Sequence, residues 1–175
     1  MSDQTIIIQS YPSPAGELII GSYGGQLCLC DWAKESRRKI IDRRLSKALK
    51  AEIREGHSKV IDKTITELDA YFAGKSSSFD IPVLFVGTDF QKSVWNALLD
   101  IPYGETISYG SLAQRLGHPK AVRAVANANG ANAISIIVPC HRVIGSNHQL
   151  VGYGGGLEAK KILLDIEAKG LSRLR

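Results

Sequence analysis

The most informative part of the chain is the stretch Ile136-Ile137-Val138-Pro139-Cys140-His141-Arg142-Val143-Ile144-Gly145. Its apolar, β-branched start predicts a buried strand or a buried extended segment. Pro139 fixes its own φ and favours an extended conformation for the residue before it. The segment would therefore present Cys140 from a stiff support, directly beside His141, a candidate base. A thiol in such a place can be a reactive nucleophile or an inert buried side chain, and the stretch alone leaves both open.

Length and composition restrict the class of protein. The chain has 175 residues with 44% hydrophobic residues, which is enough for one domain or two small ones. Its net charge is +5, and residues 86–175 carry most of the basic excess, which suits a polyanionic partner. No stretch approaches the roughly 20 apolar residues of a membrane span, and no secretory signal is evident at the start. Three cysteines, an odd number, argue against a disulfide framework, so we expect a reducing compartment, the cytoplasm.

Residues 1–86 are predicted to form an α/β domain with a small antiparallel sheet. The expected strands are Thr5–Gln9, Glu17–Ser22 and Gln26–Trp32. Cys28 and Cys30, two residues apart on the third strand, would share one face. Residues 34–55 predict one helix or a helix plus a mobile loop. Their arginine clusters favour a solvated helix face over a nucleic-acid patch.

Residues 87–175 are predicted to form a mainly α-helical domain. Helices are expected at Phe90–Asp100, Tyr109–Leu116, Lys120–Asn127 and Leu157–Ala168. A Gly-containing turn joins the second to the third, with Pro119 opening the third helix, as in a helix-turn-helix. The asparagines in 127–132 indicate a C-cap and turn, with one of them a buried hinge. The Gly-rich loop 152–156 lacks a P-loop ending and is interpreted as a wall that a flat ligand approaches closely.

Pro139-Cys140-His141-Arg142-Val143-Ile144 resembles the active-site signature of the O6-alkylguanine-DNA alkyltransferases, also called methylated-DNA–protein-cysteine methyltransferases. Other matches in that family's order and spacing are Phe90-Gln91, Val94-Trp95, Ile101-Pro102-Tyr103-Gly104, Tyr109-Gly110, Pro119-Lys120-Ala121, Arg123-Ala124-Val125, Asn132, Tyr153, Gly155-Gly156-Leu157, Lys160 and Glu167. The resemblance covers residues 88–170 closely and the first 87 in general plan. It implies the bacterial constitutive type, with a ribonuclease-H-like α/β domain followed by a helical catalytic domain.

The resemblance implies a set of catalytic residues. Cys140 would be the nucleophile, activated through a water by His141 and by Glu167. A carboxylate near a helix C-terminus is unfavourable unless it has a partner, and a histidine is the obvious candidate. Asn132 would brace the loop before the nucleophile, and Tyr109 would donate to the departing guanine. The alkyl group of a flipped-out O6-alkylguanine would pass irreversibly to Cys140, once per molecule.

The resemblance also implies how DNA and the base are held. A slim, Ala-rich helix would enter the minor groove of double-stranded DNA, and Arg123 would fill the gap left by the flipped base. The remaining DNA contacts would be Lys120, Ala121, Ala124 and Tyr109, and the base pocket would comprise Val143, Tyr153, Gly154 and Ser135. Some relatives have Pro in place of Ala133 and Ser135 and Ser in place of Gly154. The pocket should therefore be wider, and larger alkyl groups or O4-alkylthymine become candidate substrates.

We expect a monomer with no organic cofactor and no metal. The histidines do not combine with Cys28 and Cys30 at any familiar zinc spacing. A Cys–His hydrolase is an alternative, but it would need an oxyanion hole and gives the helix-turn-helix no purpose. A non-catalytic protein that binds alkylated DNA is a second alternative, which the presence of Cys140 disfavours. A helix-turn-helix transcription factor is a third, for which the Ala-rich helix offers too few long polar side chains.

Overall fold

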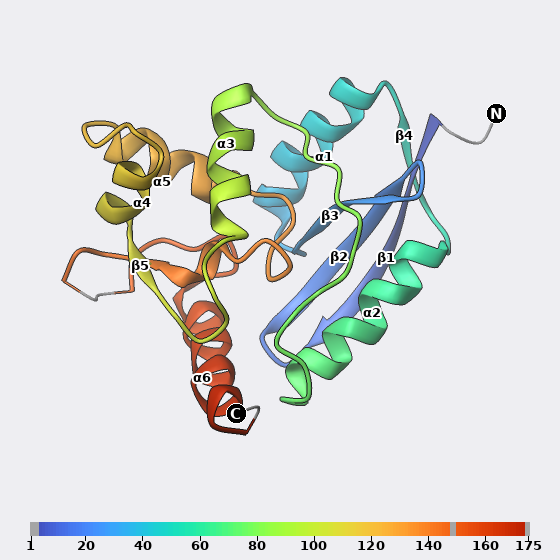
Figure 1. Ribbon diagram of the computed structural model, residues 1–175. Helices are drawn as coiled ribbons and strands as arrows, with labels where there is room; N and C mark the ends of the chain where they lie inside the picture. Colours follow the sequence, from blue (N-terminus) through green and yellow to red (C-terminus); the bar gives the residue numbers. More distant parts are fainter. Residues whose placement is uncertain (1–3, 148–149, 174–175) are drawn as a thin grey trace.

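A four-stranded sheet organises the first half of the molecule (Figure 1). The computed structural model describes residues 4–147 and 150–173. The strands are β1 (Thr5–Ser13), β2 (Gly16–Tyr23), β3 (Gln26–Trp32) and β4 (Glu52–Glu55), in the order β3-β2-β1-β4. The first three are antiparallel neighbours as predicted, but β4 runs parallel to β1, so the sheet is mixed.

The unpredicted fourth strand follows a helix that ends earlier than residue 55. α1 (Glu35–Leu49) stops at Lys50, which adopts the left-handed conformation (φ 51°) and turns the chain back toward the sheet. Residues 52–55 then pair along the whole of their length with the start of β1. The segment expected as a continued helix or a mobile loop is therefore an edge strand, and its charged residues suit an edge.

Each face of the sheet is covered by a helix (Figure 1). α1 packs Ile41 and Leu45 on one face, and α2 (Lys59–Phe72) belongs to the core cluster on the other. Cys28 lies in the cluster with α1, whereas Cys30 lies in the cluster with α2. The prediction that the two cysteines share a face was wrong. The pairing of β2 with β3 shifts by one residue at Cys28, which is left without a partner in a β-bulge. A bulge breaks the alternation of side chains between the two faces of a strand.

Four helices build the second half: α3 (Asp89–Leu98), α4 (Tyr109–Arg115), α5 (Val122–Gly130) and α6 (Leu157–Arg173). Thr88 caps α3 in a capping box with Gln91, and Ser108 caps α4. A two-residue strand, β5 (Ile107–Ser108), pairs in parallel with β6 (Val143–Ile144). None of the helices within the described residues is sufficiently long and apolar to span a bilayer.

α4, a turn and α5 form the predicted helix-turn-helix, but α5 is shifted along the sequence. It begins at Val122 because a turn first closes between His118 and Ala121, whose N–H donates to the His118 carbonyl at 2.9 Å. Pro119 therefore lies in the turn and not in the helix. The helix continues through Asn127 and Asn129 to Gly130, so these asparagines are helical and do not form the predicted cap and turn.

The segment before Cys140 is buried as predicted, but it is not a strand. Ile136 has φ 72°, a conformation that β-branched residues rarely adopt. The side chain of Asn132 bonds the backbone of Ile134 and Val138, which folds the segment into turns. Residues 133–135 are also tied to Cys30 at the edge of the sheet, through hydrogen bonds of 2.8 and 2.7 Å. These long-range ties override the local preference for an extended chain.

Candidate active site

Cys140 opens a short 3-10 helix, Cys140–Arg142, and lines a cavity of about 710 Å³. The thiol side chain is largely buried, with 5% exposure. The cavity lies between α4, α5, the nucleophile segment and the Gly-rich loop, and Arg37 of α1 reaches it from the first domain. Its lining includes Arg37, Tyr109, Arg123, Asn127, Asn129, Asn132, Ser135, Cys140, Val151, Tyr153 and Gly154. The volume is in the range that small-molecule sites use, so it can hold a single flat base.

His141 and Glu167 form a fully buried pair next to Cys140. Nε2 of His141 lies 2.6 Å from Oε2 of Glu167, so the predicted pairing of these residues is confirmed. Glu167 accepts four further hydrogen bonds, from Arg142 Nε (2.8 Å) and Nη2 (3.1 Å), the Gly104 N–H (3.1 Å) and the Tyr71 hydroxyl (2.7 Å). The carboxylate is thus fixed from both domains, and Arg142 is paired with it.

The protonation states of the site follow from its burial. Burial raises the pKa of the Cys140 thiol, and a hydrogen bond from Asn132 only partly opposes it, so the thiol needs a base. Burial lowers the pKa of His141 despite the nearby Glu167, which keeps the imidazole neutral at pH 7 and able to accept a proton. Nδ1 of His141 is buried and has no hydrogen-bond partner among the described residues.

Glu167 is held in its charged form. Burial acts to raise its pKa, but hydrogen bonds from His141 and Arg142, together with their charges, outweigh burial and lower the pKa to about 2. The carboxylate is therefore charged at neutral pH and can stabilise an imidazolium on its neighbour.

Two buried asparagines brace the segment that carries Cys140. Nδ2 of Asn132 donates to the carbonyls of Ile134 (3.2 Å) and Val138 (3.0 Å), and its Oδ1 accepts from the Ile134 N–H (2.9 Å). Nδ2 of Asn129, on α5, donates to the Cys140 carbonyl at 3.3 Å. Asn132 was predicted as the brace, whereas Asn129 was not singled out from the three nearby asparagines.

Asn132→Ala is expected to lower the free energy of unfolding by about 2 kcal/mol, because the buried Ile134 N–H loses its acceptor and the carbonyls of Ile134 and Val138 each lose one of two donors. Urea unfolding followed by circular dichroism measures this change. Asn127→Ala is the matched control, since this exposed side chain of the neighbouring helix should change stability by less than about 0.5 kcal/mol. Equal losses in the two variants would contradict the bracing role.

The Gly-rich loop lines the cavity, but its glycines also make room for the first domain. A Cβ on Gly154 would lie 2.7 Å from Cζ of Arg37, and one on Gly155 would lie 2.5 Å from the ring of Trp32. Trp32 in turn packs its ring edge-on to Tyr153, with centroids 5.8 Å apart. The close approach predicted for a ligand is therefore made, on this side of the loop, by protein side chains.

Lys160 of α6 holds the same loop from beneath. Its ammonium group donates to the carbonyls of Val143 (2.7 Å), Val151 (3.0 Å) and Gly152 (3.4 Å). Burial lowers the pKa of Lys160 to about 8, so the lysine is still mostly charged at pH 7.

Gly155→Ala is expected to destabilise the protein by about 2 kcal/mol, because the added methyl group must displace the buried Trp32 ring. Thermal unfolding of the variant measures the loss. Gly110→Ala serves as control, since no atom lies closer than 3.8 Å to a Cβ there and the residue is helical, so that variant should be at least as stable as wild type. A Gly155→Ala protein with unchanged stability would show that the loop can shift freely.

The residues predicted to contact DNA lie on the outer surface of α5, in the turn before it and on α4. Lys120, Arg123 and Ala124 are exposed, Ala121 is partly exposed, and Arg123 also lines the cavity. Tyr109 lines the cavity from α4, and burial raises its pKa, so its hydroxyl is protonated at neutral pH. The mouth of the cavity and the exposed face of α5 are thus continuous.

One predicted pocket residue is not placed in the pocket. Val143 is fully buried in β6, does not line the cavity, and its carbonyl accepts from Lys160.

Arg37, in contrast, lines the cavity and was missed because it comes from the other domain. It forms a bidentate pair with the buried Asp31 (2.9 and 3.0 Å), and Arg38 joins the same carboxylate (2.6 Å). The predicted solvated arginine face is therefore wrong for these two residues.

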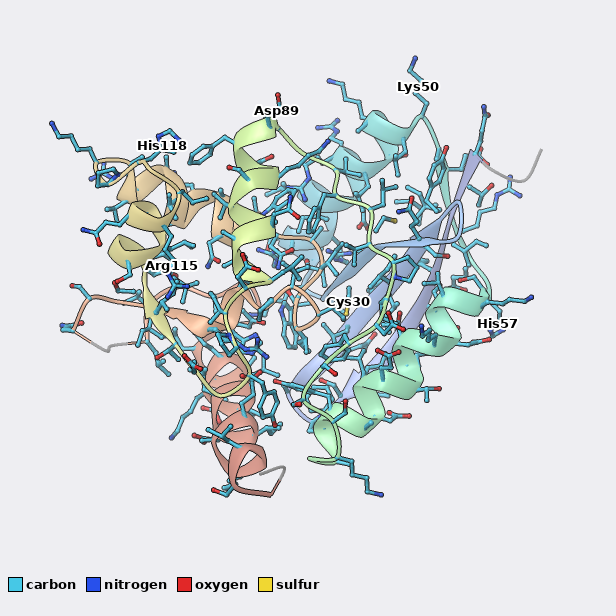
Figure 2. The ribbon with its side chains drawn as sticks, viewed as in Figure 1. Cys30, Lys50, His57, Asp89, Arg115 and His118 are labelled. Atoms are coloured by element: carbon cyan, nitrogen blue, oxygen red, sulfur yellow. The ribbon has the colours of Figure 1, made fainter. Side chains whose placement is uncertain are left out.

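Within residues 4–147 and 150–173 no group of three or more His, Cys, Asp or Glu side chains could hold a metal ion. Figure 2 shows His57 at the start of α2 and His118 beyond α4, on opposite sides of the molecule, with Cys30 between them.

Fold and site together define a DNA-binding protein with a cysteine nucleophile, and comparisons with known proteins agree. The model of the 6-O-methylguanine DNA methyltransferase ribonuclease-like domain matches residues 6–85, and that of the same family's DNA binding domain matches residues 89–169. The chain therefore belongs to the methylated-DNA–protein-cysteine methyltransferase family. It is a DNA repair enzyme that transfers an alkyl group from DNA to cysteine.

Relatives of known name and structure cover most of the chain. The methylated-DNA–protein-cysteine methyltransferase of Mycobacterium leprae is 44% identical over 159 residues, which are 91% of this chain and 90% of the relative. That of Methanosarcina acetivorans is 59% identical over 101 residues, 58% of this chain and 65% of the relative. The crystal structure of Mycobacterium tuberculosis OGT in complex with DNA has a TM-score of 0.79 at 40% identity, covering 95% of this chain and 94% of that one.

Proposed function

We propose that Cys140 accepts the alkyl group of O6-alkylguanine in double-stranded DNA and does so once per molecule. The thiolate attacks the carbon attached to O6, and a C–S bond forms as the C–O bond breaks. The electron pair of the broken bond goes to the guanine, which takes up a proton. The product is an S-alkyl thioether, which water does not cleave, so the protein is consumed by its own reaction.

The proton steps follow from the protonation states of the site. His141 takes the thiol proton at Nδ1 through a bridging water, while Glu167 holds the opposite ring nitrogen and stabilises the imidazolium. Tyr109 supplies a proton to the ring nitrogen of the departing guanine. The neutral imidazole, the charged carboxylate and the protonated phenol at the cavity support these roles.

The slim face of α5 enters the minor groove, where Ala121 and Ala124 permit close approach. Arg123 fills the gap left by the flipped base, whose extrusion costs a few kcal/mol, less for a damaged pair. Lys120 and Tyr109 complete the DNA contacts. Residues 87–175 would thus bind DNA and carry the nucleophile, while residues 1–86 form a separate domain that supports them. Binding should weaken as salt rises.

We further propose a monomer that acts in the cytoplasm, where its three unpaired thiols stay reduced. Ser135, Tyr153 and Gly154 border the space available to the alkyl group, and the small residues among them suit larger alkyl groups and O4-alkylthymine.

One observation carries the proposal: Cys140 lines the cavity that α5 borders, and a buried His–Glu pair adjoins it. The test mixes the protein with duplex DNA carrying one O6-methylguanine and measures intact mass. We expect one added methyl group per chain and repair of one DNA equivalent, however large the excess of DNA. Repair beyond one equivalent would contradict the single use, and unmodified protein would contradict the function.

A further inference from the structure

The C-terminal end of α5 depends on side chains from other elements. A helix ends with carbonyls that lack intrahelical partners and with a partial negative charge that favours cations. α5 has no basic residue in its last turn. The carbonyls at this end nonetheless all accept hydrogen bonds. Backbone N–H groups supply some of these bonds: Ala131 donates to the carbonyls of Asn127 and Ala128, and Asn132 donates to that of Asn129. Side chains supply the others: Trp95 Nε1 donates to the Ala128 carbonyl (2.8 Å), Arg37 to those of Gly130 and Asn132, and Arg44 to that of Ala131 (3.0 Å).

Arg44 is the best placed of the two arginines to fix this end. It lies on α1, in the first domain, and its Nη2 donates to the Ala131 carbonyl. Its guanidinium also stacks over the ring of Trp95, 5.7 Å from the centroid, and Trp95 holds the preceding turn of α5 through the Ala128 carbonyl. Arg37 is further committed to Asp31 and reaches its two carbonyls only at 3.3 and 3.4 Å.

We propose that Arg44 is a positioning residue, which fixes the C-terminal end of the DNA-reading helix from the first domain and so sets the pose in which α5 meets DNA. The proposal rests on the proposed function, in which α5 enters the minor groove. It gives the basic helix of the first domain a role in DNA binding without a direct contact to DNA.

Contacts other than that of Arg44 hold the pocket in place, so DNA binding by α5 can be separated from reaction in the pocket. Asn129 bonds the Cys140 carbonyl, and Val125 and Ala128 are packed in the core. Asn129 and Gly130 line the pocket at the C-terminal end of α5, whereas residues 121–124 lie at its other end. A small tilt of α5 about the Asn129 contact therefore displaces the DNA-contacting end more than the pocket. Reaction with alkylated DNA needs the exposed face, whereas reaction with a free alkylated base needs only the pocket.

The test compares transfer rates from two substrates in the full-length protein. Arg44→Met is expected to lower the second-order rate constant with duplex DNA carrying O6-methylguanine by about tenfold, the effect of one charge-assisted hydrogen bond. The rate constant with free O6-benzylguanine should change by less than about twofold. Arg44→Lys keeps the charge but loses the fork geometry and should fall between wild type and Arg44→Met.

Arg43→Met is the matched control, because it removes the same charge from the same helix. Arg43 is exposed and makes no hydrogen bond or ion pair with the described residues, so its rates on both substrates should stay within about twofold of wild type. Equal losses on both substrates in Arg44→Met and Arg44→Lys, or no loss on the duplex, would overturn the proposal. A wild-type protein inert toward both substrates would overturn the proposed function and this inference with it.

Discussion

Cys140→Ala protein is expected to gain no alkyl group from O6-methylguanine DNA, whereas the wild type gains one per chain. No other described thiol can take its place, because Cys28 and Cys30 are buried in the first domain and do not line the cavity. Burial raises the pKa of Cys28 to about 12. It also raises the pKa of Cys30, so neither thiol forms a thiolate near pH 7. Intact mass after incubation with excess duplex measures the result.

Cys28→Ala is the matched control for this loss, since it removes a buried thiol from the other domain and should leave transfer complete. DNA binding by Cys140→Ala should persist, because the exposed face of α5 is unchanged, and a gel-shift titration checks it. Alkylation of the Cys140→Ala protein would show that another group accepts the alkyl.

Local sequence rules predicted much of the fold, and the failures have physical causes. The bounds of β3 follow from nearest-neighbour chemistry, and the structure has them where expected. The buried strand or extended segment predicted before Cys140 fails because the Asn132 side chain and the backbone of the distant Cys30 hold it in turns. β4 escapes prediction because three of its four residues are charged and because it pairs with a strand far away in the sequence.

The candidate site likewise contains residues that the sequence predicts and residues that it does not. Cys140, His141 and Glu167 could be predicted because the second domain's motifs carry them. The contributions of Arg37 and Tyr71 could not, since each reaches the site from the first domain across a domain contact that no local pattern marks. The pocket wall is consequently a product of both domains, although only one carries the recognisable motifs.

Glu167→Gln is expected to be the most damaging substitution that leaves the nucleophile intact. It should lower the free energy of unfolding at pH 7 by about 3–5 kcal/mol, because the buried Arg142 loses the charge that compensates it. Transfer should slow by about 10²-fold or more, since the imidazolium of His141 loses its stabilising partner. Asp165→Asn also replaces a carboxylate by an amide, but at an exposed position of α6, and should change stability by less than about 0.5 kcal/mol. Urea unfolding and a single-turnover rate measure the two effects.

The lowered pKa of Glu167 predicts that its contribution to stability depends on pH. This dependence distinguishes an effect of its charge from an effect of its packing. The pKa of Glu167 falls from 4.5 in the unfolded chain to about 2 in the folded protein. A pKa lowered by folding contributes stability that is fully present above pH 4.5 and is lost as the pH falls toward 2. The stability gap between wild type and Glu167→Gln should therefore narrow by about 2 kcal/mol between pH 5 and pH 3. A gap that stays constant over this range would mean that Glu167 acts through its shape and hydrogen bonds and that its charge contributes nothing.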